Sequence, residues 1–157
     1  MILAVLLGIL VGSYALLSGM ARTRIGERLD RSLRGRISLA LLLGFTGLGH
    51  FVRTGEMAGM LPAWVPARES LVHVTGFLEW AGALGLLVPR VSRIAGICLI
   101  LFLAAVFPAN IYAALHRVEM GGHGMGPMYL LVRGPFQVLL VWWAWRFAVR
   151  RDPAGGR

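Results

Sequence analysis

Long apolar runs alternate with short polar segments along this chain of 157 residues. Each run is about 20 residues long or reaches that length through its flanks, which is what a helix needs to cross the hydrocarbon core of a bilayer. We therefore predict five membrane spans, at about residues 1–20, 37–51, 71–88, 94–115 and 129–149. The pattern predicts an all-α, polytopic membrane protein in which residues 1–157 form a single transmembrane domain.

The run at residues 1–20 is compatible with a cleaved signal peptide or with a retained helix. It lacks a basic n-region, although Gly19-Met20-Ala21 would pass as a cleavage site. Six arginines follow directly and would have to be translocated with a signal peptide, so we expect a retained helix. Gly8 and Gly12 form a GxxxG pair, which favours close packing against another helix.

The second span, residues 37–51, would reach only about 22 Å as a helix. We expect it to extend into its flanks, with the side chains of Arg34, Arg36 and Arg53 snorkelling to the membrane surface. Its glycine-rich end, residues 44–51, should let a neighbouring backbone approach closely.

Proline interrupts two further segments. Residues 53–69 are too apolar for a solvated loop and too rich in proline for a span, so we expect them in the outer interface with Trp64 among the head groups. In the last span, Arg133-Gly-Pro135 indicates that the regular helix begins at Pro135, a residue favoured at a first helical position.

Composition and charge agree with a membrane protein. The chain is 57% apolar and only 15% charged, and its net charge of +9 comes from sixteen arginines with no lysine. These arginines flank the apolar runs, which excludes a nucleic-acid surface and indicates contact with anionic lipid head groups. Twelve of the sixteen lie on one side of the predicted topology, so the N-terminus should be outside and the C-terminus cytoplasmic.

An acid, Glu79, lies near the middle of an apolar run. Counting inward from the outer end of each span places Glu79 at about 12 Å, Asn110 at about 9 Å, Arg133 at about 6 Å and Gln137 at about 13 Å. Charge at membrane depth is tolerated where it lines a cavity or packs against protein. We therefore predict an outward-facing pocket floored by Glu79, Asn110 and Gln137, with Arg133 as the counter-ion of Glu79.

The same level of the membrane holds His50, His73 and Tyr112, which we include as candidate ligand-binding residues. In the pocket, Glu79 would carry a proton and Arg133 would bind an anionic or carbonyl-bearing ligand. The alternative is that the Glu79 and Arg133 pair only holds the helices together.

A metal site and a haem site are two further alternatives. Met120, His123 and Met125 lie in one glycine-rich loop, and thioethers with imidazoles suit Cu(I). His50 and His73 would be the axial ligands of a haem. The single cysteine, Cys98, cannot form an intrachain disulfide.

Five stretches of the chain resemble, in order, the DoxX family of small bacterial membrane proteins, in its branch with an additional N-terminal transmembrane helix. They are Gly44-Phe-Thr-Gly-Leu-Gly-His-Phe51, Met60-Leu-Pro-Ala-Trp-Val-Pro66, residues 75–89, residues 106–114 and Arg133-Gly-Pro-Phe-Gln137. The resemblance covers about residues 37–145. It implies a four-helix transmembrane bundle plus the first helix, with motif positions at His50, Glu79, Pro108, Asn110, Arg133 and Gln137.

The resemblance implies that the protein is an accessory or anchor subunit of a redox system in the bacterial cytoplasmic (inner) membrane. Its expected ligand is a quinone-like or other small amphipathic molecule. The chain has no nucleotide fingerprint or cysteine pair, so it resembles a membrane partner more than a complete enzyme. Two alternatives stay open: a non-enzymatic chaperone or interaction protein, and a small transporter or copper-handling protein. The expected partners are the lipid bilayer, a redox protein and, in a homo-oligomer, further copies of the chain.

Overall fold

A computed structural model describes residues 2–21, 29–118 and 123–150 of the chain. These residues form helices joined by short turns, and none of them belongs to a strand. The all-α prediction is therefore confirmed for the part of the chain that the structure describes.

The helices follow the predicted apolar runs. The first stretch is continuous through α1 (Ile2–Leu7), η1 (Gly8–Gly12) and α2 (Ser13–Met20). Among the described residues, four stretches are long and apolar enough to cross a membrane: Ile2–Met20, α3 (Arg31–Val52), α5 (Arg68–Leu87) and α6 (Ser92–Leu115). The remaining elements are α4 (Thr54–Ala58), η2 (His123–Tyr129), α7 (Leu130–Ala144) and η3 (Trp145–Val149).

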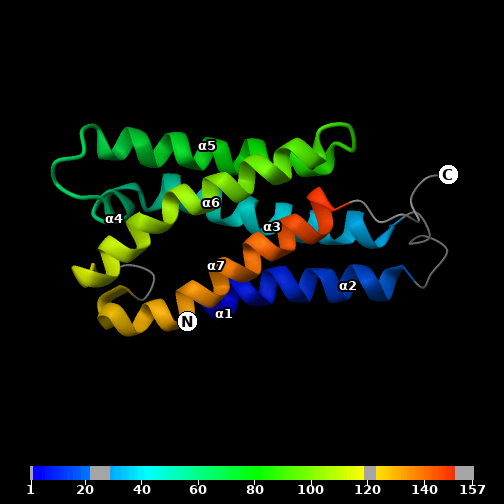
Figure 1. The fold of residues 1–157 in the computed structure, drawn as a ribbon, viewed down its shortest axis with the longest axis horizontal. Helices are drawn as coiled ribbons and strands as arrows, with labels where there is room; N and C mark the ends of the chain where they lie inside the picture. The colour runs from blue at the N-terminus through cyan, green and yellow to red at the C-terminus, as the bar shows by residue number, and fades with distance from the viewer. Residues whose placement is uncertain (1, 22–28, 119–122, 151–157) are drawn as a thin grey trace.

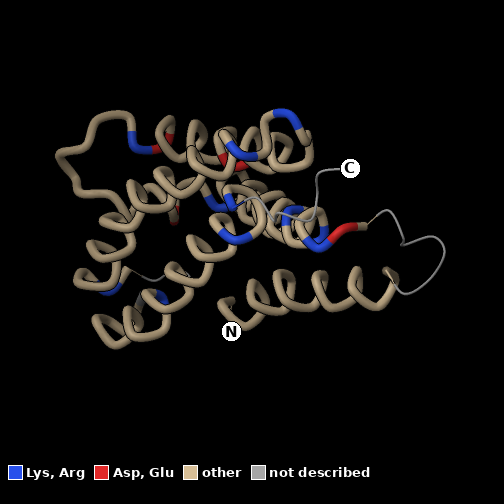
Figure 2. The backbone as a smooth tube through the Cα atoms, turned by 45° about the vertical axis from the view of Figure 1, so that its right-hand side comes forward, with Lys and Arg blue, Asp and Glu red and all other residues tan. Residues whose placement is uncertain are grey.

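Successive long helices run in opposite directions (Figure 1). The two short elements α4 and η2 lie at one end of the bundle, which we call the loop end. The turn between α5 and α6 and the start of α3 lie at the opposite end. This second end, which we call the basic end, carries most of the described arginines (Figure 2): Arg31, Arg34, Arg36, Arg90, Arg93, Arg146 and Arg150.

Glycine brings α3 and α5 into close contact. A Cβ atom added at Gly76 would lie 2.7 Å from Cβ of His50 and 3.3 Å from the carbonyl oxygen of Gly47. At Gly47, the position that a Cβ atom would take is filled by the Trp80 ring. The Nε1 of this ring donates to the Gly44 carbonyl over 3.2 Å. The prediction that the glycine-rich end of the second span admits a neighbouring backbone is confirmed.

A second contact joins the end of α7 to the start of α3. The Trp143 Nε1 donates to the Gly35 carbonyl over 3.0 Å, and the Ser32 hydroxyl donates to the Phe147 carbonyl over 2.6 Å. The first helical stretch packs here as well, because Tyr14 meets Trp143 edge to face with ring centroids 5.4 Å apart. Leu10 from the same stretch is completely buried.

Two sequence predictions about glycine and proline are wrong. A Cβ atom at Gly8 or Gly12 would meet nothing within 4 Å, so this GxxxG pair packs against no other described helix. The last helix begins at Leu130 rather than at Pro135, which lies inside the helix and leaves the Leu131 carbonyl without its usual donor four residues later.

The ends of α3 differ from the prediction in one respect. The helix does extend into its flanks, beginning at Arg31 after Asp30, whose carboxylate accepts from the Leu33 N–H at 2.5 Å. Arg36, however, does not snorkel. Its side chain is buried and its Nη1 donates to the Leu86 carbonyl over 3.4 Å, so it binds the last turn of α5 instead of the membrane surface.

The segment between α3 and α5 is partly helical, since α4 occupies Thr54–Ala58. Trp64 follows in an irregular stretch and is 82% exposed. This exposure is compatible with the predicted place among lipid head groups.

The contact at Gly76 predicts a position-specific effect of one methyl group. Gly76→Ala should destabilise the protein by about 1–3 kcal/mol, because the added Cβ overpacks the α3–α5 contact. Gly82→Ala on the same helix is the matched control, since its Cβ would meet nothing within 4 Å and alanine favours the helix. Thermal unfolding in detergent checks the pair, and equal melting temperatures would contradict the close contact.

Candidate functional site

His50 and Glu79 face each other across α3 and α5. The His50 Nε2 lies 3.5 Å from the Glu79 Oε1, and the two side chains are only 15% and 12% exposed. Each residue follows a contact glycine by three positions, Gly47 on α3 and Gly76 on α5, and so lies on the same face as that glycine. The close helix contact therefore positions the pair.

The bonding of the other ring nitrogen determines where the His50 proton resides. Nδ1 lies 2.9 Å from the Val72 carbonyl oxygen and 3.0 Å from the Thr75 hydroxyl oxygen. The carbonyl can only accept, and Thr75 already donates to it over 2.8 Å, so Nδ1 must carry a hydrogen. The remaining ring nitrogen, Nε2, faces the Glu79 Oε1, so the His50–Glu79 pair can hold a proton between these two atoms.

Arg133 is held by α6. Its Nε donates to the Asn110 Oδ1 over 3.1 Å, and the Asn110 Nδ2 donates back to the Val106 carbonyl over 3.1 Å. These two bonds fix the orientation of the amide. Asn110 is only 7% exposed, so the guanidinium is bound to a buried and fully oriented partner.

Gln137 forms the second hydrogen bond between α7 and α6. Its Nε2 donates to the Leu103 carbonyl over 2.6 Å, and the residue is only 6% exposed. Reversing the amide would place two acceptors against each other, so Oε1 must be the atom directed elsewhere. Arg133 and Gln137 are one turn apart on α7 and share a face.

Three buried polar atoms in this region have no hydrogen-bond partner: Glu79 Oε2, Arg133 Nη1 and Gln137 Oε1. We call His50, Glu79, Asn110, Arg133 and Gln137 the polar cluster. Buried polar groups without partners are uncommon and costly, which makes these atoms candidates for binding a ligand.

The predicted counter-ion relationship is wrong in its pairing. Glu79 pairs with His50, and the Nε of Arg133 is bound to Asn110. Depth along a helix does not determine which atoms of neighbouring helices meet. Thr75 was missed, and the signal that could have found it is its position four residues before Glu79, one turn away on α5.

Two of the predicted ligand-binding residues contact other partners. The His73 Nε2 lies 3.1 Å from the Thr54 hydroxyl, and its ring stacks on Phe51. Tyr112 stacks on the His116 ring with centroids 3.9 Å apart. Because His50 and His73 are directed toward different partners, they do not form a pair of axial ligands for a haem in this arrangement.

The predicted copper residues are only partly described. Met120 lies outside the described residues, as does the side chain of His123, whereas Met125 is exposed. Within the described part of the chain, no group of three or more His, Cys, Asp or Glu residues is placed to hold a metal ion.

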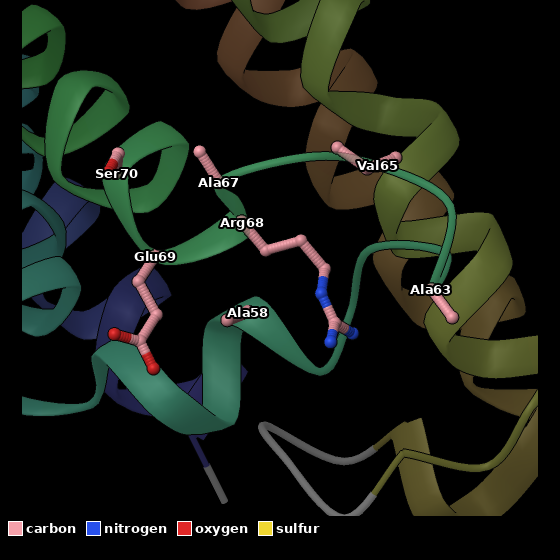
Figure 3. Close-up of a pocket in the computed structure, with 7 residues that line it drawn as sticks. All are labelled: Ala58, Ala63, Val65, Ala67, Arg68, Glu69 and Ser70. Atoms are coloured by element: carbon pink, nitrogen blue, oxygen red, sulfur yellow. The ribbon is translucent and has the colours of Figure 1, made fainter.

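An open cavity of about 470 Å³ lies at the loop end, between α4 and the start of α5. Figure 3 shows the Arg68 side chain extending across it, below the connection that carries Ala63 and Val65. No member of the polar cluster lines this cavity. The buried unpartnered atoms, and not this surface hollow, carry the candidate chemistry.

Comparison with known proteins gives one match. A family model described as a domain of unknown function (DUF8561) matches residues 39–148, well over half of the chain. The chain belongs to the DUF8561 family. No curated protein and no solved structure matches it. The matched residues contain the whole polar cluster of this DUF8561 chain.

The arrangement gives this DUF8561 chain a distinct chemical capability. The His50–Glu79 pair can hold a proton, and the free Nη1 of Arg133 can donate to an oxygen of a ligand. Glu79 Oε2 and Gln137 Oε1 can each accept a hydrogen bond. These capabilities together describe a polar binding site inside a helical bundle.

The His50–Glu79 pair predicts energetic coupling between α3 and α5. His50→Leu should destabilise the protein by about 3–5 kcal/mol, because Glu79 is then left buried without its partner. His50→Leu combined with Glu79→Leu should recover part of this loss, which a double-mutant cycle from unfolding measurements would detect. His116→Leu, at an exposed helix end, is the control. The pair would be contradicted if the losses of unfolding free energy caused by His50→Leu and by Glu79→Leu simply added in the double variant.

Proposed function

We propose that this protein is a DoxX-like, multi-pass protein of the bacterial cytoplasmic membrane that binds a small amphipathic, quinone-like molecule at the polar cluster. In this role it serves as an accessory or anchor subunit of a membrane redox system. The observation that carries the proposal is the set of three buried, unpartnered atoms: Glu79 Oε2, Arg133 Nη1 and Gln137 Oε1.

The free-energy cost of leaving these atoms without hydrogen-bond partners supports the presence of a ligand. Leaving a buried donor or acceptor unsatisfied costs about 1–3 kcal/mol, and the hydrocarbon core offers no water to relieve it. An oxygen of a ring ligand would accept from Arg133 Nη1, ring hydroxyl groups would donate to the two protein oxygens, and the apolar part of the ring would suit a helical bundle. The guanidinium of Arg133 would polarise a ligand oxygen, while the His50–Glu79 pair would supply or take up a proton.

The proposed topology has five spans, with the N-terminus outside and the C-terminus in the cytoplasm. The fifth span is α7 continued by η3, which together give 20 helical residues, Leu130–Val149. The alternating direction of the helices and the arginines at the basic end support this orientation (Figures 1 and 2). The loop end would then face outward.

A second candidate is a non-enzymatic chaperone or interaction protein. The observation that favours it is the exposure of Trp64, Met125 and Met128, which are large apolar side chains in the loop-end connections. In this alternative the polar cluster would only hold the helices together, and a partner would contact the loop end.

The ligand proposal predicts that a quinone-like molecule accompanies the purified protein. Organic extracts of protein purified in mild detergent, analysed by mass spectrometry, should contain it in about stoichiometric amount, and optical spectra with metal analysis would reveal haem or copper instead. Arg133→Gln should lower the retained amount about tenfold or more, because a charged hydrogen bond is lost. Arg53→Gln, which removes an exposed arginine, should leave it unchanged.

Two results would contradict the ligand proposal. One is an extract that contains only bulk phospholipid, and the other is equal retention by folded Arg133→Gln and wild-type protein. Either result would favour the interaction protein.

The topology predicts which positions a reagent that cannot cross membranes will reach. In a Cys98→Ser background, Glu69→Cys at the loop end should react with an impermeant maleimide in intact spheroplasts. Val91→Cys in the turn at the basic end should react only after lysis. Both positions are exposed in the fold, so accessibility within the protein does not distinguish them. The reverse pattern would contradict the orientation.

A further inference from the structure

The unpartnered atoms of the polar cluster include both hydrogen-bond acceptors and a donor. This combination determines which ligands can satisfy all of them. Glu79 Oε2 and Gln137 Oε1 are oxygens, and Arg133 Nη1 is a donor. The complement of this set is a ligand that offers two donors and one acceptor. This reasoning rests on the proposed function, since it concerns the same site.

Glu79 Oε2 is an acceptor whichever way the shared proton resides. His50 Nδ1 already donates to Val72, so a proton that the pair shares would lie between Nε2 and Oε1. If it is on His50, Glu79 is a carboxylate. If it is on Oε1, Oε2 is the carbonyl oxygen of the acid, and both forms accept at Oε2.

Gln137 Oε1 is an acceptor for an equally local reason. Its Nε2 is committed to the Leu103 carbonyl at 2.6 Å, so the amide cannot turn its donors toward the site without facing two acceptors together. Both oxygens are therefore fixed acceptors, and Arg133 cannot change its role because a guanidinium has no acceptor.

We infer that the site prefers the reduced, dihydroxy form of a quinone-like ring over the oxidised form. A ring with two hydroxyl groups can donate to Glu79 Oε2 and Gln137 Oε1 while one of its oxygens accepts from Arg133 Nη1. A quinone has two carbonyl oxygens and no donor, so it can bind Arg133 but leaves both protein acceptors unsatisfied. The preference concerns binding and requires no electron transfer by this chain.

The test compares a decyl-substituted benzohydroquinone, kept reduced under anaerobic conditions, with the matching benzoquinone. Protein in nanodiscs is studied by equilibrium dialysis, with empty nanodiscs to correct for partition into lipid. The dihydroxy ring should bind more tightly by about a hundredfold or more, because the quinone leaves two buried acceptors unsatisfied and each costs about tenfold or more. The dimethyl ether of the same ring, which has lost both donors and cannot be oxidised readily, should bind as weakly as the quinone.

Gln137→Leu provides the matched variant. It removes one acceptor and should lower the affinity for the dihydroxy ring about tenfold while leaving that for the quinone unchanged. If Gln137→Leu fails to fold because the bond to Leu103 is lost, the monomethyl ether of the ring is tested on the wild-type protein instead, since it has lost one donor and should bind about tenfold less tightly than the dihydroxy ring.

The outcomes separate this inference from the proposed function. Equal affinity for quinone and dihydroxy ring would overturn the inference and leave the ligand site intact. A preference that persists unchanged in the Gln137 variant would also overturn it, because the acceptors would not be its source. Binding of neither ring would overturn the proposed quinone-like ligand itself.

Discussion

The close approach of α3 and α5 at Gly47 and Gly76 is the constraint on which the rest of the site depends. Without side chains at these positions the helices pack so closely that a Cβ at Gly76 would overlap His50. Since His50 and Glu79 each lie three residues beyond one of these glycines, the same contact brings imidazole and carboxylate together. A larger residue at either glycine would separate two groups that are expensive to bury alone.

The opposite side of the polar cluster depends on hydrogen bonds rather than on close packing. Asn110 and the Leu103 carbonyl of α6 bind Arg133 and Gln137 of α7, which fixes both α7 side chains without using all of their polar atoms. Interhelical hydrogen bonds are a common way of joining helices in a bilayer. Here they also orient the remaining atoms, on which the proposed binding site rests.

The basic end is organised by different contacts. Arg36 donates to the last turn of α5, and Trp143 and Ser32 join α7 and η3 to α3. Tyr14 attaches the first helical stretch to the same region, and the Arg34 guanidinium lies 6.0 Å from the centre of its ring. Arginines at this end are thus partly structural, so their number alone does not measure contact with lipid.

The sequence by itself determined the helical class and the approximate extent of the long helices, because apolar length along a helix depends only on local geometry. Depth along each helix also singled out the residues of the polar cluster as candidates. The direct partner of Glu79 could not be predicted, since rotation about each helix axis is decided by packing at Gly47 and Gly76. For the same reason, the sequence could not show that Gly8 and Gly12 contact no described neighbour or that the Arg36 side chain is buried. Only the tertiary structure decided which polar atoms pair and which remain free, because hydrogen bonds require matched positions on two helices that the sequence does not align.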